Sequence, residues 1–127
     1  MSGKLLDTNI IIRYIRGDSS LDKVFEEEEL YVSTVTIGEL YYGAELSAKK
    51  EQNRAVCSDF CKELKEIRIE ENVASIYARI KAQLKNDGHL IPENDIWIAS
   101  CAMSKGLTVV TADKHFSYIK GISVEMY

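Results

Sequence analysis

Short runs of apolar residues alternate along this chain with longer segments in which apolar residues recur every three or four positions. The short runs are typical of buried strands, and the longer segments are typical of helices with one buried face. The pattern predicts five strands, over residues 4–7, 30–34, 66–69, 107–113 and 122–126. It predicts six helical segments, over residues 8–17, 19–29, 35–47, 49–64, 71–87 and 92–106.

The alternation of strands and helices determines the expected fold class. Strands joined by helices form right-handed crossovers, which lay the strands parallel and cover both faces of the sheet with helices. We therefore expect a single α/β domain over residues 1–127, with a mainly parallel five-stranded sheet. Folds of this kind bind ligands at the edge where the carboxyl ends of the strands meet.

The composition is ordinary for a globular protein, with 46% hydrophobic residues, 28% charged residues and a net charge of −4. An acidic chain is poorly suited to grip nucleic acid by overall charge, although an enzyme that reaches phosphate through bound cations is not excluded. Cys57, Cys61 and Cys101 are odd in number and lie in predicted helices, which favours reduced core thiols. The sequence shows neither a secretory signal nor an apolar run of about 20 residues, so we expect a cytoplasmic protein that does not span a membrane.

Four carboxylates attract attention, and each has an ordinary structural explanation. Asp7 is suited to cap the helix that follows it, while Thr36 and Glu39 have the T-x-x-E spacing of a capping box. Asp95 falls in a first helical turn, where negative charge suits the helix dipole. Asp113 is suited to cap the short turn after it. Taken singly, none of them requires a functional site.

Taken together, the four acids indicate a shared site. Asp7 and Asp113 follow strands, while Glu39 and Asp95 lie near the starts of helices that follow loops at the same sheet edge. Carboxylates that converge repel one another unless a cation lies among them. Because no set of His or Cys ligands accompanies them, the acids predict Mg²⁺ or Mn²⁺ rather than structural zinc.

Four segments form an ordered set along the chain: LLDTN at 5–9, TIGELYYG at 36–43, IPENDIWIAS at 91–100 and VVTADKHF at 109–116. Each is a weak signal alone, but in this order and over this length they resemble the motifs of a PIN-domain ribonuclease. Within that family the chain looks like a VapC-type toxin of a toxin–antitoxin pair. The resemblance implies a three-layer α/β/α sandwich with strand order 3-2-1-4-5. It also implies Mg²⁺- or Mn²⁺-dependent cleavage of RNA by a metal-activated water.

The resemblance assigns roles to particular residues as well. The acids that it implies to be both catalytic residues and metal ligands are Asp7, Glu39, Asp95 and Asp113. The neighbouring polar residues that match its motifs, and that we expect to orient these acids, are Thr8, Asn9, Asn94 and Thr111. The implied partners are an RNA substrate, a cognate antitoxin protein and a second copy of the chain in a homodimer.

Other conspicuous residues have plainer interpretations. RNA contacts are expected from local basic residues, namely Arg13, Arg16 and Lys114, although a solvated helix face explains each of them equally well. His89 and His115 are interpreted as surface or packing residues. The acidic run at 26–29 is interpreted as a solvated helix end.

Several apolar residues suggest a partner surface: Tyr41, Tyr42, Leu46, Tyr77, Ile80 and Leu84. The resemblance suggests a homodimer and a groove that accepts an antitoxin helix or tail, while packing in the core is the alternative for each residue.

Two other functions stay open. A PIN nuclease of RNA processing would use the same four acids, and a catalytically inactive PIN domain would bind RNA or a partner without cleavage. A phosphatase of the haloacid dehalogenase type needs a second Asp where this chain has Asn9. A receiver domain needs an Asp after the third strand, where this chain has Glu70 and Glu71.

Overall fold

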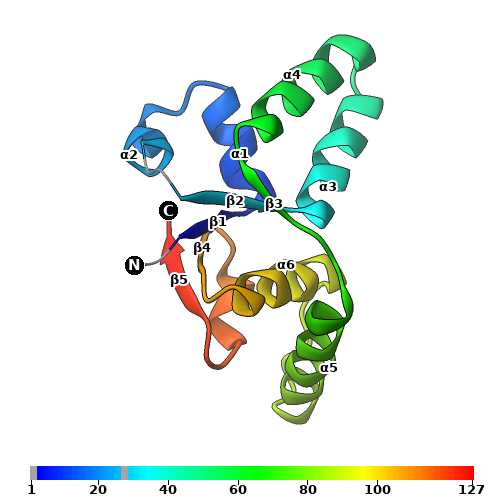
Figure 1. Cartoon of the computed structure of the whole chain (residues 1–127), viewed down its shortest axis with the longest axis vertical. Coiled ribbons are helices and arrows are strands. Elements are labelled where there is room, and N and C mark those ends of the chain that lie inside the picture. The colour runs from blue at the N-terminus through cyan, green and yellow to red at the C-terminus, as the bar shows by residue number, and fades with distance from the viewer. Residues whose placement is uncertain (1–2, 27–28) are drawn as a thin grey trace.

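A five-stranded sheet lies at the centre of the molecule and crosses the middle of Figure 1. The computed structural model describes residues 3–26 and 29–127. The strands are β1 (Lys4–Leu6), β2 (Leu30–Ser33), β3 (Lys65–Ile67), β4 (Thr108–Thr111) and β5 (Ser123–Met126). Their order is β3-β2-β1-β4-β5, and every neighbouring pair is parallel. The expected order 3-2-1-4-5 is confirmed.

Helices cover both faces of this sheet (Figure 1). One face is covered by α1 (Thr8–Ile15), α2 (Asp22–Phe25), α3 (Thr34–Glu45) and α4 (Lys50–Lys62). The other face is covered by α5 (Glu71–Asn86) and α6 (Glu93–Ser104). The described residues also include the short 3₁₀ helices η1 (Ser19–Leu21) and η2 (Lys114–Tyr118). The predicted three-layer arrangement is confirmed.

Successive residues of the central strands belong to different cores, because side chains along a strand alternate between the two faces. In β1, Leu5 joins the core on the α5 and α6 face, whereas Leu6 joins the core on the α1 and α3 face. In β4, Val109 and Val110 divide in the same way. All four side chains are fully buried. Burial on both faces explains why these strands are continuous apolar runs in the sequence.

The carboxyl ends of β1 and β4 lie side by side, which brings distant parts of the sequence together. Leu6 pairs with Val110 in the parallel register, and the backbone N–H of Asp7 donates to the carbonyl of Val110 at 3.0 Å. Asp7 and Thr111 therefore leave the sheet at neighbouring positions. Because α3 follows β2 directly, it begins at this same edge.

The segment at 19–29 differs from the single helix that was expected. It forms η1 and then the four-residue α2. Residues 27–28 lie outside the described residues, and they include the middle of the acidic run at 26–29 that was predicted to be a solvated helix end. The cause is local. The carboxylate of Asp18 accepts a hydrogen bond from the backbone N–H of Ser20 at 3.0 Å, which starts a tight 3₁₀ turn.

The start of α3 corrects a second expectation. Ser33 is the N-cap, since its hydroxyl accepts a hydrogen bond from the backbone N–H of Thr36 at 3.1 Å. Thr36 therefore lies inside the first turn and does not cap it. The capping box predicted for Thr36 and Glu39 is wrong, and Glu39 is left without that structural role.

The three cysteines are free thiols in or beside the core. Burial raises the pKa of Cys61 and of Cys101 to about 11, and Cys57 is partly buried. Their positions agree with the predicted packing role. Within residues 3–26 and 29–127, no helix is both long enough and apolar enough to cross a membrane.

Gly43 lies in the interior of α3, where glycine costs about 0.5–1 kcal/mol relative to alanine. A Cβ added at Gly43 would meet no atom within 4 Å. We expect Gly43→Ala to raise the free energy of unfolding in urea by about 0.5–1 kcal/mol. Gly3→Ala is the opposite control, because a Cβ there would lie 2.7 Å from Tyr31 Cε1. A stability loss in Gly43→Ala would contradict the open space described at this position.

Candidate active site

Asp7 lies where β1 ends and α1 begins, and its carboxylate contacts both β4 and α1. Oδ1 accepts a hydrogen bond from the backbone N–H of Thr8 at 2.8 Å, which makes Asp7 the N-cap of α1. Oδ2 accepts one from the hydroxyl of Thr111 at 2.7 Å. The residue is buried, yet each carboxylate oxygen has a second lone pair. Capping of the helix therefore leaves room for another ligand.

Asp95 and Asp113 come from two elements and approach each other closely. Asp95 lies in the first turn of α6, which begins after Pro92. Asp113 follows β4 and caps η2, because Oδ1 accepts a hydrogen bond from the backbone N–H of His115 at 2.9 Å. The hydroxyl of Thr111 accepts a hydrogen bond from the backbone N–H of Asp113 at 2.9 Å. One buried threonine thus positions acids on both sides of it.

Glu39 reaches this group from the middle of α3. Its Oε1 accepts a hydrogen bond from the hydroxyl of Thr8 at 2.5 Å, and its Oε2 accepts one from the side-chain amide of Asn94 at 3.1 Å. Thr8 begins α1, and Asn94 lies in the first turn of α6. Glu39 is therefore tied to the same two helices that carry Asp7 and Asp95.

Three of the four residues expected to orient the acids form hydrogen bonds with them: Thr8, Asn94 and Thr111. Asn9 differs, because it is exposed in the first turn of α1. The structure brings together all four acids, with Asp7 and Asp95 each close enough to Asp113 to feel its charge. Their catalytic and metal-binding roles stay predictions.

His115 was expected at the surface or in packing, and its position corrects that expectation. Nδ1 lies 3.3 Å from Asp95 Oδ2 and 2.9 Å from Asp113 Oδ1. Its neighbour in the same motif, Asp113, caps the turn, so the histidine two positions later folds back over that carboxylate. His89 behaves as predicted, since its ring stacks on Tyr118 with 4.3 Å between ring centroids.

Burial and mutual repulsion alter the acidity of these groups. Burial raises the pKa of Asp7, and the charges of Glu39 and Asp113 raise it further, whereas the hydrogen bonds that Asp7 accepts lower it. Burial is also the main cause that raises the pKa of Asp95 to about 7, with the charges of Asp113 and Asp7 adding to it. Desolvation alone would lower the pKa of His115, but the two neighbouring carboxylates outweigh it and raise the pKa.

The donor atoms at this edge fit a divalent cation. Carboxylate oxygens are the ligands that Mg²⁺ and Mn²⁺ favour. Positive charge among them would relieve the repulsion that raises the pKa values of Asp7 and Asp95. Asp95, Asp113 and His115 already offer ligand atoms that all lie within 4.8 Å of one another. The acidic cluster is therefore suited to hold a metal ion.

The basic residues expected to contact RNA have different surroundings. Lys114 is exposed directly beside Asp113. Arg16 is exposed at the end of α1, where it lines a groove. Arg13 forms an ion pair with Asp18, with both Nε and one terminal nitrogen 2.9 Å from Asp18 Oδ2. Of the three residues, Arg13 alone would have to give up this ion pair to bind phosphate.

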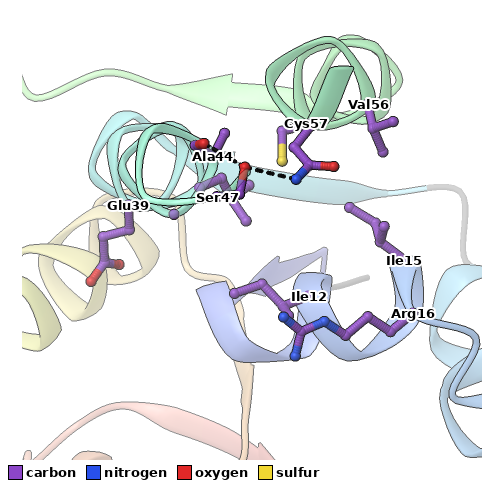
Figure 2. A pocket seen from close by; sticks show the side chains of 11 residues that line it. Ile12, Ile15, Arg16, Glu39, Ala44, Ser47, Val56 and Cys57 are labelled. Atoms are coloured by element: carbon purple, nitrogen blue, oxygen red, sulfur yellow. Dashed lines mark hydrogen bonds between the residues drawn. The ribbon is translucent and has the colours of Figure 1, made fainter. Parts of the chain in front are cut away.

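The groove lies between α1, α3 and α4 and has a volume of about 280 Å³. Figure 2 shows Ile12 and Ile15 of α1 across from Val56 and Cys57 of α4. Glu39 lies at one end, so the groove runs up to the acidic site. The walls are mainly apolar, which suits the apolar face of a helix.

Core packing accounts for much of the apolar set that suggested a partner surface. Ile80 and Leu84 are buried in the core on the α5 and α6 face. Tyr77 stacks on Trp97 with 3.8 Å between ring centroids. Two residues near the end of α3 stay largely exposed: Tyr42 and Leu46. None of the six residues lines the groove, whose walls come from other positions of α1, α3 and α4.

Comparison with known proteins gives matches over nearly the whole chain. The model of the PIN domain family matches residues 4–122. Ribonuclease VapC2 of Haemophilus influenzae is 42% identical over 110 residues, which is 84% of this chain and 83% of that protein. The tRNA(fMet)-specific endonuclease VapC of Shigella flexneri is 33% identical over 125 residues, which is 95% of each protein.

The fold agrees with these matches. The crystal structure of DNA-bound VapBC from Salmonella typhimurium contains a chain that aligns with a TM-score of 0.92 at 33% identity, over 99% of this chain and 98% of that one. The family model, the relatives and the fold all indicate the same family as the acids at the carboxyl ends of β1 and β4. The chain belongs to the PIN domain family, among its VapC-type members.

Proposed function

We propose that this protein is a Mg²⁺- or Mn²⁺-dependent endoribonuclease and the toxin of a type II toxin–antitoxin pair. The observation that carries the proposal is the convergence of four acids from separate segments at one sheet edge: Asp7, Glu39, Asp95 and Asp113. Relatives bear the names of VapC ribonucleases, and one is described as specific for tRNA(fMet). All four acids being present supports an active enzyme over a binding module.

The residues at the site divide the work of phosphodiester hydrolysis. Asp7, Asp95 and Asp113 would hold a divalent cation, which would supply positive charge against the scissile phosphate and increase the acidity of water. Thr111 forms hydrogen bonds with both Asp7 and Asp113 and so fixes their relative positions. Glu39 has both oxygens fixed by hydrogen bonds, and their second lone pairs orient the attacking water and accept its proton. In-line attack by water expels the 3′-oxygen and leaves 5′-phosphate and 3′-hydroxyl ends.

RNA binding to an acidic chain depends on local positive charge. Lys114 lies beside Asp113 and Arg16 lies at the groove, and both side chains are exposed and so accessible to phosphate. Arg13 contributes by exchanging Asp18 for a phosphate. We expect binding to weaken with added salt, in proportion to the few phosphates neutralised.

The test is cleavage of total cellular RNA by the purified protein with Mg²⁺, with Mn²⁺ and with EDTA. We expect cleavage that requires the metal, leaves 5′-phosphate ends, and falls on the order of 10³-fold in Asp7→Asn, which keeps the side-chain shape but loses the charge. Asp59→Asn is the matched control, because Asp59 is an exposed residue of α4. The control should cleave like the wild type.

Two results would contradict this proposal. Equal cleavage by wild type and Asp7→Asn would show a contaminating nuclease or a different site. No cleavage of any cellular RNA by either protein would favour the inactive, binding form of the domain. Metal-dependent cleavage without toxicity to the host, and without a neighbouring gene for a DNA-binding antitoxin, would favour the nuclease of RNA processing.

We further propose that a cognate antitoxin binds in the groove between α1, α3 and α4. The support is its apolar lining and its continuity with Glu39, because a helix seated there would reach the acids. Solved relatives include VapBC toxin–antitoxin structures. A homodimer and a cytoplasmic location complete the proposal, and exposed Tyr42 and Leu46 offer apolar surface for the second copy.

Val56→Glu tests the groove without disturbing the core, since Val56 is 45% exposed on its wall. We expect affinity for the antitoxin to fall at least tenfold, because a carboxylate would be desolvated against apolar side chains, while RNA cleavage by the free protein stays unchanged. Binding is measured by calorimetry. Ile69→Glu is the control, as Ile69 is similarly exposed at 40% and lies outside the groove. Equal effects of both substitutions would place the antitoxin elsewhere.

A further inference from the structure

We propose that the imidazole of His115 is a direct ligand of the divalent cation and makes the site prefer Mn²⁺ to Mg²⁺. The proposal rests on the metal-dependent activity proposed above. It adds a nitrogen ligand to a site that sequence analysis described by its acids alone. Asp95 and Asp113 lie beside it as oxygen ligands of the same cation, in addition to Asp7.

The three donor atoms already have the spacing of ligands around one cation. His115 Nδ1 lies 3.3 Å from Asp95 Oδ2 and 3.2 Å from Asp113 Oδ2. Adjacent ligands of an octahedral cation with bonds of about 2.1 Å are separated by about 3 Å. All three ligand atoms lie within 4.8 Å of one another, so small side-chain movements would bring them onto one cation.

The fold holds the imidazole in this position before a cation arrives. The backbone N–H of His115 donates to Asp113 Oδ1 at 2.9 Å, which shapes the turn that carries both side chains. The next residue, Phe116, is fully buried and anchors η2 in the core. The side chain of His115 is 46% exposed, so a cation with its remaining waters can reach Nδ1 from solvent.

An imidazole ligand discriminates between the two candidate cations. Mg²⁺ binds oxygen ligands and dehydrates reluctantly, whereas Mn²⁺ accepts nitrogen more readily. The neutral imidazole with its proton on Nε2 leaves the Nδ1 lone pair free for the cation. Carboxylates joined by one imidazole therefore bind Mn²⁺ more tightly than Mg²⁺. Loss of the imidazole should remove most of that preference.

The alternative role for the ring is that of a hydrogen-bond donor. In that arrangement a proton on Nδ1 bridges Asp95 and Asp113, and the imidazole positions the carboxylates without touching the cation. Spectroscopy of bound Mn²⁺ separates the two roles, since only a direct ligand gives strong coupling between the unpaired electrons and nitrogen.

The test is pulsed electron paramagnetic resonance of Mn²⁺ bound to the whole chain, freed of any histidine tag. The chain has two histidines, so His115→Gln has a matched control in His89→Gln, whose ring stacks on Tyr118 instead. We expect nitrogen modulation in the wild type and in His89→Gln, and its loss in His115→Gln. Labelling the histidines with ¹⁵N should change the modulation of the wild type, a result that does not depend on the folding of any variant.

Calorimetric titration supplies a second readout. We expect the ratio of Mn²⁺ to Mg²⁺ affinity to fall by on the order of tenfold in His115→Gln and to stay constant in His89→Gln. Mn²⁺ bound without nitrogen coupling overturns the ligand assignment and leaves the nuclease standing. Binding of Mg²⁺ without Mn²⁺ overturns the ligand assignment alone, whereas absence of binding of either cation overturns both proposals. Nitrogen coupling in a protein that cleaves no RNA supports the assignment and overturns the proposed activity.

Discussion

Asp95→Asn is expected to abolish RNA cleavage and, in the metal-free protein, to increase stability above about pH 7. Asparagine keeps the shape of the side chain and removes the negative charge that would hold a cation. Cleavage should therefore fall on the order of 10³-fold. The stability gain has the opposite sign because, without a cation, the same charge is buried beside Asp113 and Asp7.

The pH dependence follows from the pKa of Asp95, which burial raises to about 7, above the value of about 3.9 in an unfolded chain. Between these two values the native carboxyl keeps its proton while the unfolded chain loses it. Stability therefore falls as pH rises from about 4 to about 7, and the destabilisation stays above that window. We expect Asp95→Asn to gain on the order of 2 kcal/mol at pH 8, after allowance for solvent screening, and almost nothing at pH 4.

Urea denaturation of the metal-free proteins at both pH values measures this difference. Asp87→Asn is the control with the opposite sign, since a hydrogen bond from Gln83 lowers the pKa of Asp87. Removing that carboxylate should not stabilise the protein at pH 8. Equal stability of Asp95→Asn and wild type at pH 8 would contradict burial as the origin of the raised pKa. Retained cleavage would place Asp95 outside the reacting site.

Phe116→Ala is expected to cause the greatest loss of stability. The Phe116 ring is fully buried in the core on the α5 and α6 face. Truncation removes the burial of the ring and leaves a cavity, which costs about 3–5 kcal/mol. Because η2 also carries His115 and follows Asp113, the site should lose its geometry as well, and cleavage should fall even where most molecules remain folded.

The free energy of unfolding in urea and the cleavage rate are measured on the same samples. Tyr118→Ala is the control within η2, because Tyr118 is 45% exposed and its truncation should cost less than about 1 kcal/mol. Wild-type stability in Phe116→Ala would contradict the core described here. Full cleavage in a destabilised but folded Phe116→Ala would show that η2 does not position the site.

Hydrophobic periodicity predicted the elements whose burial follows a simple rule, and it failed where local hydrogen bonds decide. The apolar runs at β1 and β4 are buried on both faces, so they were recognisable as strands. The segment 19–29 has helical spacing at Leu21 and Val24, yet Asp18 starts a 3₁₀ turn there. A side chain that bonds to its own backbone leaves no periodic signal.

The acids of the site could be identified from the sequence, but most of the hydrogen bonds that position them could not. Parallel strands share a carboxyl edge, which is enough to bring Asp7 and Asp113 together. The hydrogen-bond partners of Glu39 lie 31 and 55 residues away along the chain, and no local sequence pattern predicts such contacts. For His115 the available signal was D-x-H directly after a strand. That spacing folds the ring back on a capping Asp, but the approach to Asp95 needs the tertiary structure.

The position of β1 in the sheet determines when the acidic site can form during synthesis on the ribosome. β1 is synthesised before the other strands of the sheet but lies in its middle, and the hydroxyl partner of Asp7 is 104 residues further along the chain. Because synthesis runs from the N-terminus, the nascent chain cannot assemble its acidic site until β4 and η2 have left the exit tunnel. The unfinished chain of such a ribonuclease therefore cannot cleave the messenger from which it is being made.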